Sequence, residues 1–467
     1  MRIALIICPF GNLTVPPYNL ALLSACLRKE GHDVFCFDLN ARLQRYIEFK
    51  EGTGDCPVKN DFLNWYDKGQ VLEFMEKYDY YISILIEEIL GKEVGVVGFS
   101  IYDSSRWFSE EAASRIKKED PSIKVIFGGY PCFREDFSLL LMDNQNIDAV
   151  CLGEGEFSLN NLIRQFEESQ SDLSFCAGFI YRDKNNRIVN CGKESPILNL
   201  DLIPFSDFSD FDLKLYDETA GLGISTSRGC INHCLFCEES VLLHPFRKRT
   251  ALNIYSEISY QSKKYPLLEY LSFNDSAING DMKELNELIS LLTKNKLTFI
   301  RWGGQAMIRE EMNLSFLKKM KEAGFSSVSY GLETASPKIL KKMGKNFNLE
   351  IAEKVIEDTN KAGIYQAVNI ITGFPGETQL DIIMTSHFLK RNLEFIDEVF
   401  IHPLVLLPNS LLYKKREHFG IVVSDMNPKK GWHSEGGMNN FKARMENARF
   451  LKDSLGDKVK VSFNENS

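Results

Sequence analysis

The chain has 467 residues, of which 44% are hydrophobic and 25% are charged. This composition is typical of folded globular proteins and excludes a disordered or fibrous protein, while the length suggests two or three domains. The formal net charge of −9 provides no basic footprint for general nucleic-acid binding, and no apolar run is long enough to span a membrane. We therefore expect a cytoplasmic protein with no nucleic-acid partner and no membrane span.

Residues 1–165 alternate short apolar runs with helical patterns. Strands are expected at 3–10, 34–39, 94–101, 124–128 and 149–152, and helices at 18–29 and 105–118. This order of strands and helices is typical of a doubly wound parallel sheet. The pattern predicts a Rossmann-like domain at 1–165, whose ligands lie beyond the carboxyl ends of its strands.

The pattern changes at 166–215, where we expect a linker with a hairpin that turns at Asn185 and Asn186. Residues 216–408 then repeat strand and helix, and the six strands are expected at 222–227, 269–274, 297–302, 326–331, 366–372 and 397–402. Six such units favour a partial (β/α)6 barrel of the TIM type. The fold class is therefore α/β, with two domains of this class joined by the linker.

Residues 409–467 are expected to form a small C-terminal cap or substrate segment. It contains Trp432, His433 and the flexible run Gly436, Gly437 and Met438. Paired glycines permit hinge motion, so one interpretation is a lid that closes over the barrel and contacts the substrate. The other interpretation is a simple packing element.

The eleven cysteines are unevenly distributed. Eight are single, and most of these fall in apolar runs where a small buried hydrophobic residue is expected: Cys8, Cys26, Cys36, Cys56, Cys132, Cys151, Cys176 and Cys191. The other three, Cys230, Cys234 and Cys237, lie together. An odd total argues against a disulfide framework.

The three grouped cysteines stand at CxxxCxxC spacing in STSRGCINHCLFCEES, directly after the first strand of the predicted barrel. Three thiolates on one loop can hold three irons of a [4Fe-4S] cluster and leave the fourth iron without a protein ligand. The alternative is a structural zinc site completed by His233 or His244. Structural zinc sites usually show two paired ligand groups, and only one group is present here.

This loop resembles the signature of the radical S-adenosylmethionine (SAM) superfamily, including the aromatic Phe236 before the last cysteine. Four further segments agree with the resemblance and follow successive predicted strands: SFNDS (272–276), RWGGQ (301–305), YGLETAS (330–336) and NIITGFPGET (369–378). The resemblance implies that SAM is bound by Phe236, Asn274, Asp275, Gln305, Glu333, Ser336 and Gly373. Two positions depart from the pattern, because Ile231 stands where relatives often have Pro and Arg309 is the basic residue nearest Met307.

The first domain resembles the cobalamin-binding domain that precedes many radical SAM barrels. The segments that carry this likeness are PPYNLALLSACLRKEGHDVFCFDLN, VVGFSIYDS, VIFGGYP and DAVCLGEGEFSL. The resemblance implies that cobalamin is bound by Pro16, Pro17, Tyr18, Leu20, Ser100, Tyr102, Gly128, Gly129, Tyr130, Gly153, Glu154, Gly155 and Glu156. Glu154 and Glu156 could alternatively act as an acid–base pair.

No DxHxxG motif is present, and His32 is the only histidine in the first 230 residues. We therefore expect cobalamin to be bound without a histidine ligand, with His32 as a turn residue. Trp65 and Tyr66 either lie over the lower corrin face or pack as core or lid.

The resemblance implies a cobalamin-dependent radical SAM methyltransferase. In such enzymes a 5′-deoxyadenosyl radical abstracts hydrogen from an unactivated carbon of a small-molecule or peptide substrate, which then takes a methyl group from methylcobalamin. The expected electron donor is a flavodoxin or a ferredoxin. The alternatives are a cyclase or rearrangement enzyme with the same cofactors and a non-catalytic cobalamin or iron–sulfur sensor.

Overall fold

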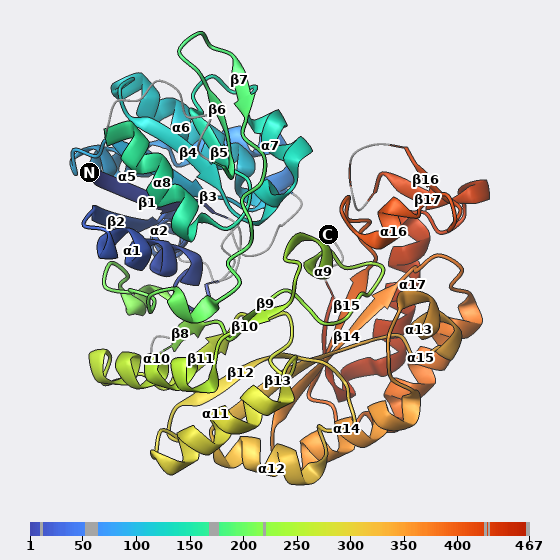
Figure 1. Ribbon diagram of the computed structural model, residues 1–467. Helices are drawn as coiled ribbons and strands as arrows, with labels where there is room; N and C mark the ends of the chain where they lie inside the picture. Colours follow the sequence, from blue (N-terminus) through green and yellow to red (C-terminus); the bar gives the residue numbers. More distant parts are fainter. Residues whose placement is uncertain are drawn as a thin grey trace. The chain divides into compact units, whose positions relative to one another are not determined.

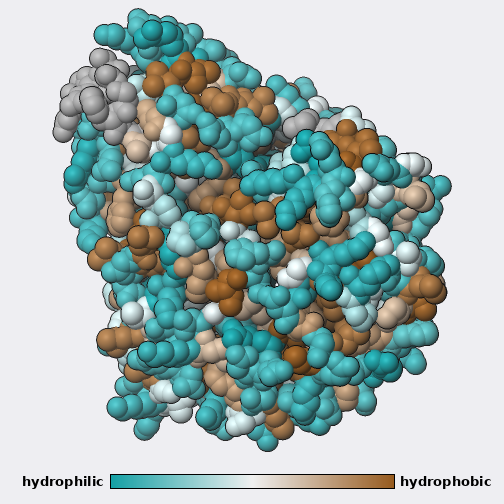
Figure 2. Space-filling view, turned by 45° about the vertical axis from the view of Figure 1, so that its right-hand side comes forward, coloured by the Kyte–Doolittle hydropathy of each residue, from teal (hydrophilic) through white to brown (hydrophobic). Residues whose placement is uncertain are grey.

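The computed structural model describes residues 1–9, 13–51, 64–167, 177–217, 221–424, 427 and 430–463. The chain divides into two compact units, Met1–Gly223 and Ile224–Glu465 (Figure 1). No helix among the described residues is long and apolar enough to cross a membrane. On the face drawn in Figure 2, hydrophilic residues predominate and the hydrophobic ones form small separate patches.

The elements of the first unit alternate strands and helices. In chain order they are β1 (Arg2–Ile7), α1 (Tyr18–Lys29), β2 (Asp33–Asp38), α2 (Leu39–Glu51), η1 (Asn64–Tyr66), α4 (Lys68–Lys77), α5 (Asp79–Leu90), β3 (Val96–Ser100), η2 (Asp103–Ser105), α6 (Arg106–Glu119), β4 (Lys124–Gly128), η3 (Tyr130–Phe133), α7 (Glu135–Leu141), β5 (Ala149–Cys151), α8 (Gly155–Glu167), β6 (Phe179–Arg182), β7 (Ile188–Asn190), η4 (Leu200–Leu202) and η5 (Leu213–Leu215).

Within the described residues, seven strands form the first sheet in the order β2-β1-β3-β4-β5-β6-β7. Strands β1 to β5 pair in parallel, and the hairpin β6–β7 is added antiparallel at β5. Helices α1 and α8 pack together, while α2, α4, α5 and α6 form a second group, so helices cover both faces of the sheet (Figure 1). This confirms the doubly wound fold. The order in which the strands are added to the sheet reverses between β1 and β3, and such folds bind their ligands at this point.

The buried single cysteines Cys8, Cys26, Cys36, Cys132 and Cys151 confirm the expected burial. Cys191 follows β7, the last strand at this end of the sheet among the described residues, and is only half-buried. Cys56 and Cys176 lie outside the described residues.

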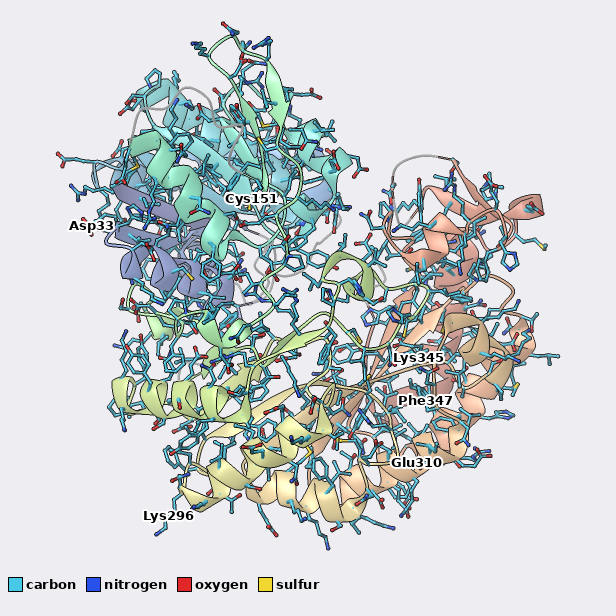
Figure 3. The ribbon with its side chains drawn as sticks, viewed as in Figure 1. Asp33, Cys151, Lys296, Glu310, Lys345 and Phe347 are labelled. Atoms are coloured by element: carbon cyan, nitrogen blue, oxygen red, sulfur yellow. The ribbon has the colours of Figure 1, made fainter. Side chains whose placement is uncertain are left out.

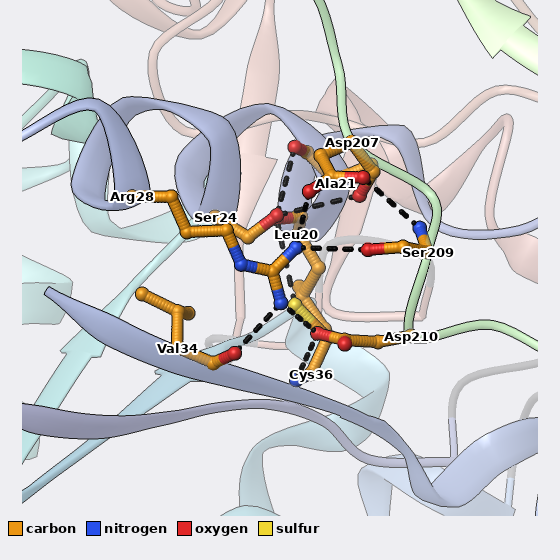
Figure 4. Close-up of polar contacts among 9 residues, drawn as sticks. All are labelled: Leu20, Ala21, Ser24, Arg28, Val34, Cys36, Asp207, Ser209 and Asp210. Atoms are coloured by element: carbon orange, nitrogen blue, oxygen red, sulfur yellow. Dashed lines mark hydrogen bonds and ion pairs between the residues drawn. The ribbon is translucent and has the colours of Figure 1, made fainter. Parts of the chain in front are cut away.

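A polar latch holds the segment 206–211 to α1 and β2 (Figure 4). The guanidinium of Arg28 forms ion pairs with Asp207 and Asp210, and Asp210 also accepts a hydrogen bond of 2.8 Å from the backbone N–H of Cys36 on the edge strand β2. Ser24 donates to the backbone carbonyl of Asp207. The latch therefore covers the edge of the sheet, which would otherwise present unpaired backbone groups.

The second unit repeats strand and helix in the predicted manner. Its elements, beginning with the strand at the division, are β8 (Gly221–Ile224), β9 (Ser227–Arg228), α9 (Glu239–Leu242), β10 (Arg247–Lys248), α10 (Ala251–Lys264), β11 (Tyr270–Phe273), α11 (Met282–Lys294), β12 (Arg301–Ala306), α12 (Leu314–Glu322), β13 (Phe325–Glu333), α13 (Pro337–Met343), α14 (Leu349–Lys361), β14 (Tyr365–Thr372), α15 (Gln379–Asn392), β15 (Glu398–Pro403), α16 (Leu411–Lys414), β16 (Ile421–Val423), β17 (Trp432–Ser434), η6 (Glu435–Gly437), α17 (Phe441–Leu455), η7 (Gly456–Lys458) and β18 (Lys460–Ser462).

Among the described residues, seven strands form the second sheet in the order β18-β15-β14-β13-β12-β11-β8. Strands β11 to β15 and β18 pair in parallel, and helices α10 to α15 lie along the outer side of the sheet (Figure 1). The seventh strand, β18, comes from the C-terminal segment, and α17 packs against β14, β15 and α15. The α/β fold class is confirmed, and the sheet extends one strand beyond the six that the sequence predicts.

The third predicted strand, 297–302, is wrong in position, because the structure places β12 at Arg301–Ala306. A glycine pair normally weakens a strand, so the sequence favours a loop here. In the structure the neighbours approach closely: a Cβ at Gly303 would lie 2.1 Å from the Ser327 Oγ, and one at Gly304 would lie 3.0 Å from the Phe273 Cβ. The two glycines therefore allow this strand to fit between β11 and β13.

Candidate functional site

The three cysteines lie on the loop between β9 and α9, as the sequence predicts. Cys234 is buried, while Cys230 and Cys237 are half-buried. The loop is held at Leu235 by two backbone hydrogen bonds. The Leu235 N–H donates one of 2.9 Å to the Met343 carbonyl, and the Leu235 carbonyl accepts one of 2.7 Å from the Leu412 N–H. The backbones of α13 and α16 thus fix the middle of the cysteine loop.

The thiols are close enough to influence one another electrostatically. Burial raises the pKa of Cys237 to about 12, and the charges of Cys234 and Cys230 act in the same direction. Bound iron would keep such thiols as thiolates, because the metal competes with the proton. A set of three thiol donors on one loop fits a cluster with an open iron.

The zinc alternative needs a histidine beside the thiols. His233 and His244 are both exposed. Over the part of the chain that the structure describes, no three His, Cys, Asp or Glu side chains gather at the spacing of one metal ion. The three thiols form one ligand group without a second pair, and such a group fits a cluster with an open iron better than a structural zinc ion.

Asp275 follows β11 and is buried. Its carboxylate accepts hydrogen bonds from the Thr226 N–H, the Thr226 hydroxyl at 2.7 Å and the Ser227 hydroxyl at 2.5 Å. Burial raises its pKa, and these hydrogen bonds oppose that shift. Asp275 therefore anchors the start of the cysteine loop, whereas the neighbouring Asn274 leaves its side chain exposed.

Glu333 ends β13 in a strained position, with φ of 68° at a shift in the register with β14. Its carboxylate forms a buried ion pair of 2.8 Å with Lys345, and the two side chains are only 9% and 10% exposed. The Lys345 ammonium also donates 3.0 Å to the Gly331 carbonyl and lies 5.7 Å from the centre of the Phe236 ring. A buried charge pair is thus placed directly beside the cysteine loop.

Sequence reasoning missed Lys345 (Figure 3). Burial alone would lower its pKa, but the Glu333 carboxylate and Cys234 hold the pKa above its ordinary value, so the ammonium stays charged. The only sequence signal is a lysine shortly after the helix that follows YGLETAS. Pairing with Glu333 becomes visible only when the chain is folded.

Ser336 is fully buried and caps α13. Its hydroxyl donates 2.6 Å to Asp381, which also pairs with Lys338 at 2.7 Å. Despite burial, the pKa of Asp381 is held well below its usual range by Lys338 and these hydroxyl donors. Ser336 is therefore occupied within the chain, and Gln305 on β12 is exposed.

Gly373 begins the loop after β14 with φ of 85°. Its N–H donates a hydrogen bond of 2.5 Å to the Glu377 carboxyl group, and its carbonyl accepts one of 2.7 Å from the Asn439 side-chain amide. A Cβ at Gly373 would lie 2.2 Å from the side chain of Arg444. The C-terminal segment therefore packs directly against the predicted SAM loop, a contact that the sequence does not reveal.

The C-terminal aromatic Trp432 is buried, with the Arg444 guanidinium 3.8 Å from its ring centre. It shares a hydrophobic core with Phe374 and Met343. This arrangement corresponds to the packing interpretation of Trp432. Met438, after the glycine pair, is 70% exposed.

In the first unit, the predicted cobalamin residues follow the carboxyl ends of β1, β3, β4 and β5. Asn19, at the start of α1, donates a hydrogen bond of 2.7 Å to the hydroxyl of Ser100, the last residue of β3. The positions are Pro16, Pro17, Tyr18 and Leu20 around the start of α1, Ser100 at the end of β3 and Tyr102 after it, Gly128 at the end of β4 with Gly129 and Tyr130 after it, and Gly153, Glu154, Gly155 and Glu156 between β5 and the first turn of α8. The structure thus brings them to one edge of the sheet.

Two glycines shape this edge in different ways. Gly129 has φ of 115°, and a Cβ there would lie 2.4 Å from the Ile101 carbonyl. Gly153 has φ of 144°, but nothing lies within 4 Å of its Cβ position. Close backbone packing at one loop and open space at the next fit a bulky ligand that approaches the backbone.

Not every predicted residue presents a side chain to this edge. Leu20 is fully buried in α1, and Glu156 is buried in α8. The Glu154 carboxylate accepts a hydrogen bond of 2.9 Å from the Ile197 N–H. One of the two carboxylates considered for acid–base chemistry therefore has a structural contact.

His32 precedes β2 and therefore lies at the amino ends of the strands, opposite the predicted cobalamin loops. Its ring lies 3.0 Å from the Asn160 side-chain oxygen on α8. Trp65 is buried and packs against Phe74 and Phe108, whereas Tyr66 is 43% exposed. Trp65 thus has the contacts of a core residue.

Comparisons with known proteins agree with this architecture. Residues 224–389, which lie in the second unit, match the family model of the radical SAM superfamily. The chain is 26% identical to an uncharacterized methyltransferase from Pyrococcus horikoshii, over 81% of this chain and 74% of the relative. It is also 26% identical to the cytidylyl-2-hydroxyethylphosphonate methyltransferase of Streptomyces wedmorensis, over 77% of this chain and 69% of the relative.

One solved structure shares this fold over nearly the whole length of the chain. The radical SAM methyltransferase TsrM from Kitasatospora setae, with cobalamin and a [4Fe-4S] cluster bound, matches with a TM-score of 0.71 at 15% identity. The match covers 99% of this chain and 93% of that one. The predicted resemblance to radical SAM proteins with a cobalamin-binding domain is therefore confirmed at the level of the fold.

Proposed function

We propose that this protein is a cobalamin-dependent radical SAM methyltransferase of the cytoplasm that methylates an unactivated carbon. The observation that carries the proposal is the loop of three thiols with the buried Glu333–Lys345 pair beside it. When bound, the cluster supplies an electron to SAM, and cobalamin supplies the methyl group. The likeness to named methyltransferases over most of the chain supports this choice.

The residues of the second unit have distinct roles in the proposal. Cys230, Cys234 and Cys237 hold the cluster, and Asp275 positions their loop through Thr226 and Ser227. The methionyl end of SAM carries both a carboxylate and an ammonium group. Lys345 would bind the carboxylate and Glu333 the ammonium, so the buried pair would exchange its internal contact for ligand contacts.

Gly373 would lie in the loop that borders SAM, and its backbone is held from both sides. Glu377 fixes its N–H and Asn439 fixes its carbonyl. Burial raises the pKa of Glu377 to about 8, so it is mostly protonated at neutral pH and adds no negative charge near the SAM carboxylate. Phe236 offers an apolar face beside Lys345.

The first unit would hold cobalamin at the carboxyl edge of its sheet. Gly153 leaves open space in which the corrin could approach the backbone, while Gly129 allows its loop to pack closely against Ile101. The Asn19–Ser100 hydrogen bond joins the start of α1 to the end of β3. His32 lies at the opposite edge, so it does not serve as a ligand to cobalt. This arrangement supports binding without a protein imidazole.

The test is anaerobic reconstitution with iron, sulfide and cobalamin, followed by incubation with methyl-deuterated SAM, a reductant and candidate substrates. Formation of 5′-deoxyadenosine together with S-adenosylhomocysteine and a deuteromethylated product is expected. Deoxyadenosine without methyl transfer would favour the cyclase or rearrangement alternative. If neither deoxyadenosine nor a methylated product formed, the result would contradict the proposal and favour a sensor.

A further inference from the structure

Two carboxylates follow the last cysteine of the loop directly, at Glu238 and Glu239. Glu238 is buried and accepts a hydrogen bond of 2.7 Å from the Asn409 N–H. Glu239 is half-buried and accepts one of 2.8 Å from the Ser276 hydroxyl. Burial raises the pKa of the Cys237 thiol to about 12, and the charge of Glu239 adds to this rise. This end of the cysteine loop therefore carries negative charge.

The cation that approaches the loop from another element is Lys345, just after α13. The chain directly before it is held to the loop, because the Met343 carbonyl accepts a hydrogen bond of 2.9 Å from the Leu235 N–H. A Cβ at Gly344 would lie only 3.9 Å from the Cα of Cys234. The backbone at the end of α13 therefore carries the lysine to the cysteine loop.

Burial makes the charge of this lysine effective. The side chain of Lys345 is 10% exposed, whereas Lys341 on α13 is exposed. Water and salt screen an exposed charge far more than a buried one. Burial lowers the pKa of the Lys345 ammonium, but Glu333 and the thiols of Cys234 and Cys237 raise it. The ammonium and the loop therefore interact electrostatically.

The ion pair of Lys345 and Glu333 does not act on the loop symmetrically. Burial raises the pKa of the Cys234 thiol, and of the two charges the ammonium lowers that pKa more than the carboxylate raises it. The ammonium also lies 5.7 Å from the centre of the Phe236 ring, within the same loop. The positive end of a neutral pair thus faces the cysteines. Nearby charges and hydrogen bonds are among the means by which a protein sets the potential of an iron–sulfur cluster.

We propose that Lys345 raises the reduction potential of the cluster held by the cysteine loop and that Glu333 limits this rise. The inference rests on the proposed function, which places a [4Fe-4S] cluster at the loop, and it gives the pair a role before SAM binds. In the reduction, the cluster accepts one electron from an external reductant such as dithionite, and no covalent bond forms or breaks. A fixed positive charge nearby stabilises the added negative charge, and a fixed carboxylate opposes it.

The experiment uses the full-length protein, reconstituted with iron and sulfide and without SAM, and follows the spin-resonance signal of the reduced cluster at a series of potentials. We expect Lys345→Met to lower the equilibrium constant for reduction about tenfold, which corresponds to about 59 mV for one electron. Glu333→Gln should shift the potential upward. The double variant Lys345→Met/Glu333→Gln restores the net charge and should lie between the two single variants.

The control Lys341→Met removes an exposed charge from α13 and should leave the potential unchanged. If Lys345→Met alone does not fold or hold a cluster, Glu333→Gln and the double variant decide the test, because the potential of the first must lie above that of the second. Shifts of the same sign in the two single variants, or equal potentials in Glu333→Gln and the double variant, would overturn the inference.

Deoxyadenosine formation by the unaltered protein with dithionite separates this inference from the proposed function. If no deoxyadenosine forms with SAM, the proposed function is contradicted, and the measured potentials stand by themselves. If deoxyadenosine forms but the potentials do not shift as described, only the role of Lys345 and Glu333 in setting the potential is overturned.

Discussion

The predicted SAM residues of the second unit are held by side chains from other elements, whereas the predicted cobalamin loops of the first unit depend more on backbone shape. Asp275, Glu333 and Ser336 each have a charged or hydroxyl partner within the unit. At the first unit's edge, Gly129 and Gly153 set the space. The charged ligand proposed for the second unit would thus be held by positioned polar groups, whereas the large flat ligand proposed for the first unit would need clearance at the backbone.

The largest expected effect follows from removing the cluster ligands. Replacing Cys230, Cys234 and Cys237 by Ala should abolish iron binding and deoxyadenosine formation, because the loop would keep no thiolate. Circular dichroism and thermal unfolding check that the fold remains. Iron retained in stoichiometric amount by the triple variant would show that the ligands lie elsewhere.

The buried pair provides a sharper test of the charged-ligand side of the comparison. Lys345→Met should destabilise the protein by about 3–5 kcal/mol, because it leaves Glu333 buried without its counter-charge. SAM binding should also fall strongly. As a control, Arg391→Met removes a surface partner of Glu353, whose pair is 65% and 38% exposed, and should cost less than about 1 kcal/mol.

Denaturant unfolding and calorimetric titration with SAM measure the two effects of Lys345→Met. The double variant Lys345→Met/Glu333→Gln should recover part of the stability, because no charge is then left buried. It should not recover SAM binding. Full SAM affinity in the double variant would contradict the assigned role.

Two glycine variants test the backbone side of the comparison. Gly153→Ala should cost about 1–2 kcal/mol from its unfavourable φ alone. Gly129→Ala should cost about 2–5 kcal/mol, because the added Cβ also collides with the Ile101 carbonyl. Denaturant unfolding of the two variants measures the difference in the free energy of unfolding. Equal losses of stability would show that the two loops are equally constrained.

The buried Asp38 of the first unit gives a smaller, pH-dependent effect. Burial raises its pKa to about 6, while the Tyr216 hydroxyl and the Ala41 N–H act against that shift. The folded state therefore binds more protons than the unfolded state between about pH 4 and pH 6, so this group's contribution to stability falls as pH rises through that window.

Asp38→Asn should remove that dependence. The stability of the variant relative to the unaltered protein should therefore be greater at pH 7.5 than at pH 4. Denaturant midpoints at the two pH values measure it. A difference of the opposite sign would mean that Asp38 is charged in the fold and stabilised by its donors.

The smallest effect is expected for His32→Ala. The loss of the Asn160 contact should reduce stability by about 1 kcal/mol and leave the absorption and spin-resonance spectra of bound cobalamin unchanged. Loss of nitrogen hyperfine splitting in this variant would show that His32 reaches cobalt.

The sequence predicts the parts of the fold that are local. Strand and helix alternation identifies both α/β units, and the spacing of Cys230, Cys234 and Cys237 identifies the cysteine loop. Contacts between distant segments escape it: β18 joins β15 across the C-terminal segment, and Lys345 becomes a site residue only through Glu333. The predicted position of the third strand is wrong, because close packing against Ser327 outweighs the weak strand preference of Gly303 and Gly304.

The most direct test of the central claim needs no knowledge of the substrate. The full-length protein, reconstituted with cluster and reduced cobalamin, is incubated anaerobically with methyl-deuterated SAM, and the cobalamin fraction is analysed by mass spectrometry. The account predicts that the deuterated methyl group appears on cobalamin with an equal amount of S-adenosylhomocysteine. Unlabelled cobalamin, with SAM intact, would contradict it.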